Sequence, residues 1–148
     1  MNVSLQIARA VAKELDQDPV YDRAKALGSQ SVGLRRAQIS GLESVANGTR
    51  KVSDVLDYIK LRTARHKEWR VNEIGAALLE AMEQDLRTRR DGICNELTSL
   101  ADGAAVDDYM RQDIYLRLIR GFVAQLAAQY EFASMQHGRS GADERDSR

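Results

Sequence analysis

The feature that most restricts the fold is a continuous apolar stripe at helical spacing in residues 106–135. Apolar side chains recur there every three or four residues, and polar side chains lie opposite them. The stripe consists of Tyr115, Leu118, Ile119, Phe122, Leu126, Tyr130 and Ala133. On the polar side, Asp113 and Arg117 have the i,i+4 spacing of a helical ion pair. The pattern predicts one long amphipathic helix.

Shorter segments with the same periodicity fill most of the remaining chain. Proline occurs once, and the abundant Ala, Leu, Arg, Glu and Gln lose little side-chain freedom in a helix. We expect helices over residues 3–15, 18–27, 31–47, 49–67 and 70–101. The last of these is either one long helix or two with a break near Asp91 and Gly92. The sequence therefore predicts an all-α fold, a compact bundle of five to six helices with a long amphipathic C-terminal helix.

Glycines mark the expected ends and contacts of these helices. Gly28 is expected to end the second helix, and Asn47 with Gly48 to cap the third, because both residues tolerate positive φ. Gly41 lies inside the third helix, where it indicates a close helix crossing.

Length and composition predict one domain and a polar tail. A chain of 148 residues fits a single domain and can bury roughly 68–70% of its unfolded surface. We assign residues 1–135 to a single helical domain. Residues 136–148 are rich in Gly, Ser and charges, which predicts a disordered polar tail.

Several features favour a cytoplasmic protein without a membrane partner. Cys94 is the only cysteine, so no intrachain disulfide can form, and its helix-interior spacing indicates a small core residue. No apolar stretch approaches the roughly 20 residues that span a bilayer. Residues 1–15 lack the uninterrupted apolar core of a signal peptide.

The sequence carries no recognisable catalytic or metal-binding motif. A phosphate-binding glycine loop, HExxH, CxxC and GxSxG are all missing. Arg62 and His66 are separated by three residues, whereas the Arg…His motif of HEPN-type ribonucleases has four to six. Glu80, Glu83 and Asp85 have no histidine at ligand spacing, which indicates a solvated helix face. We therefore predict a protein that is not an enzyme and has no cofactor or metal.

Charge is balanced over the whole chain but unevenly distributed along it. Residues 34–70 hold nine Lys/Arg and four Asp/Glu, a net charge of +5, and residues 71–108 hold three Arg and nine Asp/Glu, a net charge of −6. Either the two segments pair with each other or with the next copy in an assembly, or the basic segment contacts phosphates.

The basic segment contains the predicted nucleic-acid-binding residues. On a helical projection Lys51, Tyr58, Arg62 and Arg65 share one face, and Arg35 projects into the apolar arc of the third helix. Such cations contact phosphates without reading sequence, and Tyr58 or Trp69 is placed to stack on a base. The predicted contacts are Arg35, Arg36, Lys51, Tyr58, Arg62, Arg65, Lys67 and Arg70.

The order of helices resembles the small helical subunits of type III CRISPR effector complexes. The matching stretches are residues 6–10, 21–24, 33–34, 115–120 and 130–133, of which YLRLIR and YEFA near the end are the most suggestive. The resemblance implies a non-catalytic structural subunit of an RNA-guided antiviral ribonucleoprotein. Its copies would stack along the guide–target duplex and steady the RNA backbone, while larger protein subunits perform cleavage. The basic and acidic segments would then be complementary faces in head-to-tail self-stacking.

Two other functions remain open from the sequence. A helical adaptor or regulator without nucleic-acid binding would use the apolar stripe of the last helix, or the acidic residues 71–108, as its interface. A DNA-binding regulator would use the third helix, the turn at Asn47 and Gly48, and the fourth helix as a helix-turn-helix, although Val52, Val55, Leu56 and Ile59 have the pattern of a core face.

Overall fold

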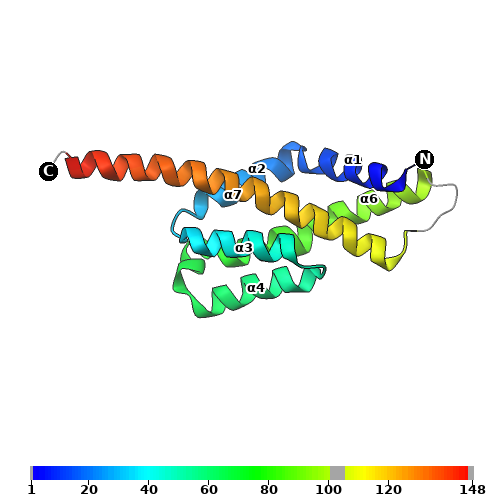
Figure 1. The fold of residues 1–148 in the computed structure, drawn as a ribbon, viewed down its shortest axis with the longest axis horizontal. Coiled ribbons are helices and arrows are strands. Elements are labelled where there is room, and N and C mark those ends of the chain that lie inside the picture. Colours follow the sequence, from blue (N-terminus) through cyan, green and yellow to red (C-terminus); the bar gives the residue numbers. More distant parts are fainter. Residues whose placement is uncertain (1, 101–105, 147–148) are drawn as a thin grey trace.

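The protein is an all-α bundle around a long C-terminal helix (Figure 1). The structure is a computed structural model, and it describes residues 2–100 and 106–146. The elements are α1 (Val3–Leu15), α2 (Asp18–Gln30), α3 (Arg36–Gly48), α4 (Val52–Arg65), the 3-10 turns η1 (Lys67–Trp69) and η2 (Val71–Glu73), α5 (Ile74–Glu80), the π-helical segment η3 (Ala81–Leu86), α6 (Arg87–Leu100) and α7 (Asp108–Asp146). Because α5, η3 and α6 are continuous, the described residues form six helices and no strand, which confirms the predicted fold class.

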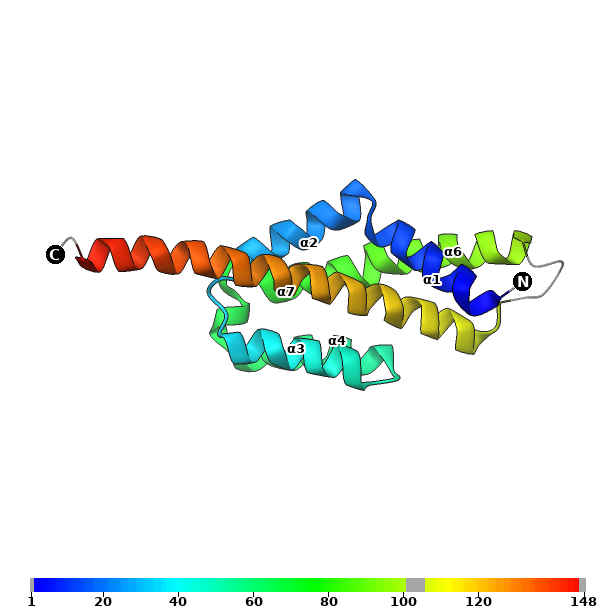
Figure 2. The same ribbon diagram turned by 45° about the horizontal axis from the view of Figure 1, so that its top comes forward.

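Helix α7 lies at the centre of the bundle. Figure 2 shows α1 and α2 on one side of it, the antiparallel pair α3 and α4 on the other, and α6 beside α1. Helix α7 contacts α1, α2, α3, α4, η3 and α6. Its predicted stripe is buried from Tyr115 to Tyr130. Burial of this apolar surface is therefore a main force that holds the other helices against α7.

The far end of α7 projects beyond the other helices (Figures 1 and 2). The helix ends at Asp146, past the predicted end at Met135. The bounds of the single domain, residues 1–135, and the disorder of residues 136–148 stay predictions. The predicted ion pair within α7 is confirmed, with Arg117 Nε 3.0 Å from Asp113 Oδ2.

Gly28 lies inside α2, so the prediction that it ends this helix was wrong. A Cβ atom at Gly28 would lie 2.6 Å from the Leu126 carbonyl oxygen and 2.8 Å from Gln129 Cβ. The glycine is therefore required by the close approach of α2 to the backbone of α7. Beside this crossing, Gln129 Nε2 donates to Ser29 Oγ at 3.0 Å.

The turn between α3 and α4 is held by α7 rather than by a glycine cap. Helix α3 ends at Gly48 as predicted, but neither Asn47 nor Gly48 has the positive φ of a left-handed cap. Instead, Arg120 Nε donates to the Ala46 carbonyl at 2.8 Å, and an Arg120 terminal nitrogen donates to the Thr49 carbonyl at 2.7 Å. These bonds satisfy carbonyls that a helix end leaves without partners.

Helix α3 begins at Arg36, later than the predicted start near residue 31. Ser31 is buried, and its hydroxyl donates to the Leu27 carbonyl at 2.6 Å. The Leu34 amide then donates to the Ser31 carbonyl at 2.8 Å, which closes a turn before α3. Gly41 leaves space for the hydroxyl group of Tyr58, which reaches across from α4. This contact is with a side chain, so the close helix crossing predicted at Gly41 stays a prediction.

The helix that follows η2 is irregular at residues 81–86 rather than at Asp91 and Gly92. It continues through both of those residues, so the alternative with a break there was wrong. The predicted end at residue 101 lies outside the described part of the chain. Within η3, the Met82 carbonyl accepts a hydrogen bond of 2.7 Å from the Tyr115 hydroxyl. This hydrogen bond ties α7 to the π-helical segment, where the regular α-helical bonding pattern is interrupted.

Buried charge surrounds this hydrogen bond. Arg90 is only 8% exposed, and its guanidinium lies 5.0 Å from the centre of the Tyr115 ring. Asp91 Oδ1 lies 2.8 Å from a terminal nitrogen of Arg90 and 2.8 Å from one of Arg111. Burial raises the pKa of Tyr115 and that of Cys94, which is buried as predicted.

Gly28→Ala is expected to lower the free energy of unfolding by about 1–2 kcal/mol. The cost of displacing the α7 backbone exceeds the gain of about 1 kcal/mol in helix propensity. Gly92→Ala is the matched control, because a Cβ atom at this α6 position meets nothing within 4 Å. The control should gain about 1 kcal/mol. Urea unfolding followed by circular dichroism measures both, and a stabilised Gly28→Ala protein would contradict the close crossing.

Tyr115→Phe is expected to cost about 1 kcal/mol at neutral pH, because the hydrogen bond from the Tyr115 hydroxyl to the Met82 carbonyl is lost. The raised pKa of Tyr115 means that the native state binds this proton more tightly than the unfolded chain. The stabilisation that comes from this proton is therefore fully present below the ordinary tyrosine pKa of about 10. It is lost as the pH rises through the higher pKa that Tyr115 has in the native state.

Urea unfolding at about pH 9 and about pH 11 tests this sign. The wild type should lose more stability over that interval than Tyr115→Phe. Cys94 titrates in the same direction in both proteins, so its contribution cancels. Equal losses would contradict the role assigned to the Tyr115 proton.

Candidate nucleic-acid interface

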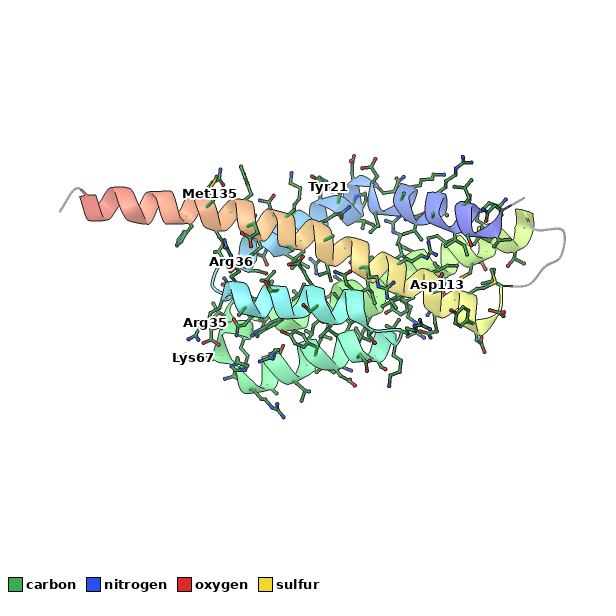
Figure 3. The ribbon with its side chains drawn as sticks, in the orientation of Figure 1. Tyr21, Arg35, Arg36, Lys67, Asp113 and Met135 are labelled. Carbon is green, nitrogen blue, oxygen red and sulfur yellow. The ribbon has the colours of Figure 1, made fainter. Side chains whose placement is uncertain are left out.

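Most of the predicted basic residues gather where α3 begins and α4 ends. The two helices run antiparallel, so the start of α3 lies beside the last turn of α4 and the following turn η1 (Figure 1). Figure 3 shows Arg35, Arg36 and Lys67 at this end of the bundle. We call this surface the basic end. It comprises Arg35, Arg36, Arg62, Arg65, Lys67 and Arg70.

Lys51 does not belong to the basic end, although on a helical projection it shares a face with Arg62 and Arg65. It is the N-cap residue of α4 and therefore lies at the opposite end of that helix. Helix α4 has 14 residues, so about 20 Å of helix separates Lys51 from the last turn. The Lys51 ammonium instead lies 3.8 Å from Asp54 Oδ1.

Trp69 is part of the core, whereas Tyr58 is half-buried against it. Trp69 is fully buried, so its predicted role in stacking on a base was wrong. Its ring meets that of Tyr58 edge-on, with 6.2 Å between their centres. The Tyr58 hydroxyl donates to the Gln38 carbonyl at 3.1 Å, and the Arg62 guanidinium covers the Tyr58 ring at 5.0 Å. Tyr58 therefore already has contacts within the protein, and its contact with a nucleic acid stays a prediction.

Three of the six basic-end cations are engaged by this chain itself. Arg62 Nη1 lies 3.2 Å from His66 Nε2, in addition to its contact with Tyr58. Arg70 donates to the carbonyls of Thr63 and Ala64, each at 3.1 Å, and so caps the C-terminal end of α4. Arg36 forms an exposed ion pair of 2.9 Å with Glu131 of α7.

The other three cations, Arg35, Arg65 and Lys67, form no ion pair with any residue that the structure describes. All three are exposed. Arg35 is the N-cap residue of α3, and its side chain is exposed. Of the two outcomes expected for its charge, extension into solvent or contact with an anion, the structure shows the first. The Arg35 backbone amide donates to Gln38 Oε1 at 2.9 Å. The positive end of the α3 dipole lies beside it, which adds to the positive potential.

The basic and acidic segments of the chain do not neutralise one another extensively. Within the described residues, one ion pair joins residues 34–70 to residues 71–108, between Lys60 and Glu83 at 3.5 Å. Asp91 pairs with Arg90 and Arg111 instead. The positive charge of the basic end therefore remains available to a ligand.

The structure narrows the two alternative interfaces. The apolar stripe of α7 is buried from Tyr115 to Tyr130, so this part of it is not available as the interface of an adaptor protein. Helices α3 and α4 pack against each other and run antiparallel in Figure 1, whereas the two helices of a helix-turn-helix cross steeply. Val52, Val55 and Ile59 are buried, as the core pattern predicted.

The described part of the chain was also compared with the requirements of metal sites and of membrane-spanning helices, and the chain with known proteins. Its His, Cys, Asp and Glu side chains form no group of three or more that could hold a metal ion. None of its helices combines the length and apolar character needed to cross a membrane. Searches against protein-family models, curated proteins and solved structures find no match to this chain.

Arg70→Gln is expected to lower the free energy of unfolding by about 1 kcal/mol, because two α4 carbonyls lose a charged donor. Arg65→Gln is the matched control. Like Arg70→Gln it removes one positive charge near the end of α4, but Arg65 forms no ion pair with any residue that the structure describes. The control should change stability by less than about 0.5 kcal/mol. Chemical unfolding distinguishes the two, and equal effects would contradict the capping role of Arg70.

Proposed function

We propose that this chain is a non-catalytic small subunit of an RNA-guided ribonucleoprotein, and that its basic end contacts the RNA backbone. The observation that supports this most directly is the set of exposed cations without acidic partners, Arg35, Arg65 and Lys67. They belong to three successive elements that pack together, α3, α4 and η1, so the fold fixes the relative positions of their backbones. The side chains themselves are exposed and lose rotamer freedom when they bind a phosphate, so each charge-assisted contact has to offset that cost.

The chemistry of the basic end suits phosphates better than bases. Both aromatic rings nearby are engaged, Tyr58 by Arg62 and Trp69 by burial. Guanidinium and ammonium groups on an exposed surface attract phosphate oxygens without discriminating between sequences. The expected activity is sequence-independent binding of an RNA backbone.

The resemblance to type III CRISPR small subunits supplies the proposed context. In that context larger protein subunits bind the guide and cut the target, and this chain steadies the RNA between them in the cytoplasm. Copies would self-stack through oppositely charged surfaces. The acidic residues 71–108 are suited to this because, in the part of the chain that the structure describes, Lys60 is the one residue of the basic segment that pairs with them.

A protein-only adaptor is the second proposal, and one observation favours it. An open groove of about 590 Å³ lies between α3 and α4, lined by Val45, Tyr58 and Leu61 with Asp54 and Asp57 among its polar residues. Leu61 is 50% exposed and adds apolar surface to this groove. Such a groove fits a partner segment with apolar and basic side chains.

Fluorescence anisotropy with a labelled oligouridine across a salt series tests the RNA proposal. Each phosphate contact on a single strand contributes about 0.7 to the magnitude of the slope of log Kobs against log salt concentration. Changing Arg35, Arg65 and Lys67 together to Gln should therefore reduce that magnitude by about 2. Affinity at low salt should fall correspondingly.

The matched control changes Arg9, Arg50 and Lys51 to Gln. These residues are also exposed, and the change in net charge is the same, but they lie outside the basic end. The control should keep the wild-type slope. If both triple variants lost the same amount of RNA affinity, the effect would depend on net charge alone. That outcome would contradict the proposed site. Absence of RNA binding by the wild type, with no RNA co-purified from cells, would favour the adaptor.

A further inference from the structure

A second surface, distant in sequence from the basic end, is hollowed into a cavity of about 490 Å³. It lies at the bend between α1 and α2, across from η3 and the start of α6. Glu14, Pro19 and Val20 flank the bend, Leu86 belongs to η3, and Phe122 belongs to α7. Two interruptions of regular helix, the bend at residues 16–17 and the π-helical segment, thus meet at this cavity.

The lining combines an apolar part with charged groups. Val20, Leu86 and Phe122 are buried core residues that also border the cavity. Among the charged lining residues, Arg89 is neutralised by Glu14, with 3.0 Å between Arg89 Nη1 and Glu14 Oε2. This combination of apolar surface and few polar groups, and this volume, are typical of small-molecule sites.

Arg23 is the unexplained charge in this lining. It is half-buried, and its guanidinium forms no hydrogen bond or ion pair with any residue of the described structure. Its Nε atom is shielded from solvent and has no acceptor. A partly desolvated cation without a counter-charge is unfavourable, because its lost hydration is not replaced. Asp85 also borders the cavity, but it is exposed and forms no ion pair with Arg23.

We propose that this cavity binds a small amphipathic anion. An apolar body, aromatic or aliphatic, would contact Val20, Leu86 and Phe122, and a carboxylate or similar acidic group would pair with Arg23. The anion supplies the acceptor that Arg23 lacks, and the apolar body excludes water from the exposed part of the lining. This site is independent of RNA binding at the basic end.

Nuclear magnetic resonance titration of the full chain with 2-naphthoate tests the proposal. Naphthoate carries an aromatic body and a carboxylate, and 2-naphthamide is its neutral counterpart. Saturable shifts are expected at Val20, Arg23, Leu86 and Phe122, with naphthoate bound about tenfold more tightly than naphthamide because its bond to Arg23 is charge-assisted.

Two variants separate the acidic group from the apolar body. Arg23→Gln should remove the preference for naphthoate and leave both compounds bound with similar affinity. Gly92→Leu places a side chain at the edge of the cavity, where a Cβ atom meets nothing within 4 Å, and should block both compounds without unfolding the protein.

Arg9→Gln removes an arginine of α1 that does not line the cavity, and it should retain the tenfold preference. The proposal would be overturned by the absence of saturable binding, by shifts located at the basic end instead, or by a naphthoate preference that persists in Arg23→Gln. Intact spectra of both cavity variants establish that they are folded, so loss of binding in them reports on the cavity.

Discussion

Burial of the α7 stripe is the interaction on which the rest of the structure depends. A helix with apolar side chains along most of its length must be covered, and this chain covers it with α1 and α2, with α3 and α4, and with α6. Gly28 permits the close approach of α2, because a Cβ atom there would meet the α7 backbone. The same helix carries polar groups that fix its neighbours: Arg120 caps the end of α3, and Gln125 Nε2 donates to the Leu15 carbonyl at 3.0 Å.

The two proposed binding sites, the basic end and the cavity beside Arg23, both result from the way the helices pack around α7. The basic end exists because α3 and α4 are antiparallel, which brings an N-terminal residue of one beside the last turn of the other. The cavity exists because α1 and α2 bend, and η3 departs from regular helix, on the side of α7 that carries Phe122. In each place charged groups remain that the fold itself does not neutralise. Arg65 and Lys67 are exposed to solvent, whereas Arg23 is partly removed from it.

Sequence periodicity predicted the helices and the α7 stripe because both depend on local spacing, which the chain displays directly. It failed where a distant contact decides the outcome. Gly28 continues a helix because α7 passes beside it, and Trp69 is buried because Tyr58 and the end of α4 enclose it. Charge alone found the basic end, but it could not separate free cations such as Arg65 from a capping residue such as Arg70. The Arg23 cavity has no sequence signal, since its lining residues come from five separate elements.

The burial of Trp69 gives the protein a natural optical reporter. It is the only tryptophan in the chain, it is fully buried, and it lies in η1 between Lys67 and Arg70. Emission excited at the red edge of protein absorbance therefore arises from this one position, in an apolar environment next to the basic end. Local opening of that region exposes the indole to water and shifts its emission to longer wavelength. Comparing this signal with backbone dichroism would reveal whether the surface near η1 opens independently of the helices around α7.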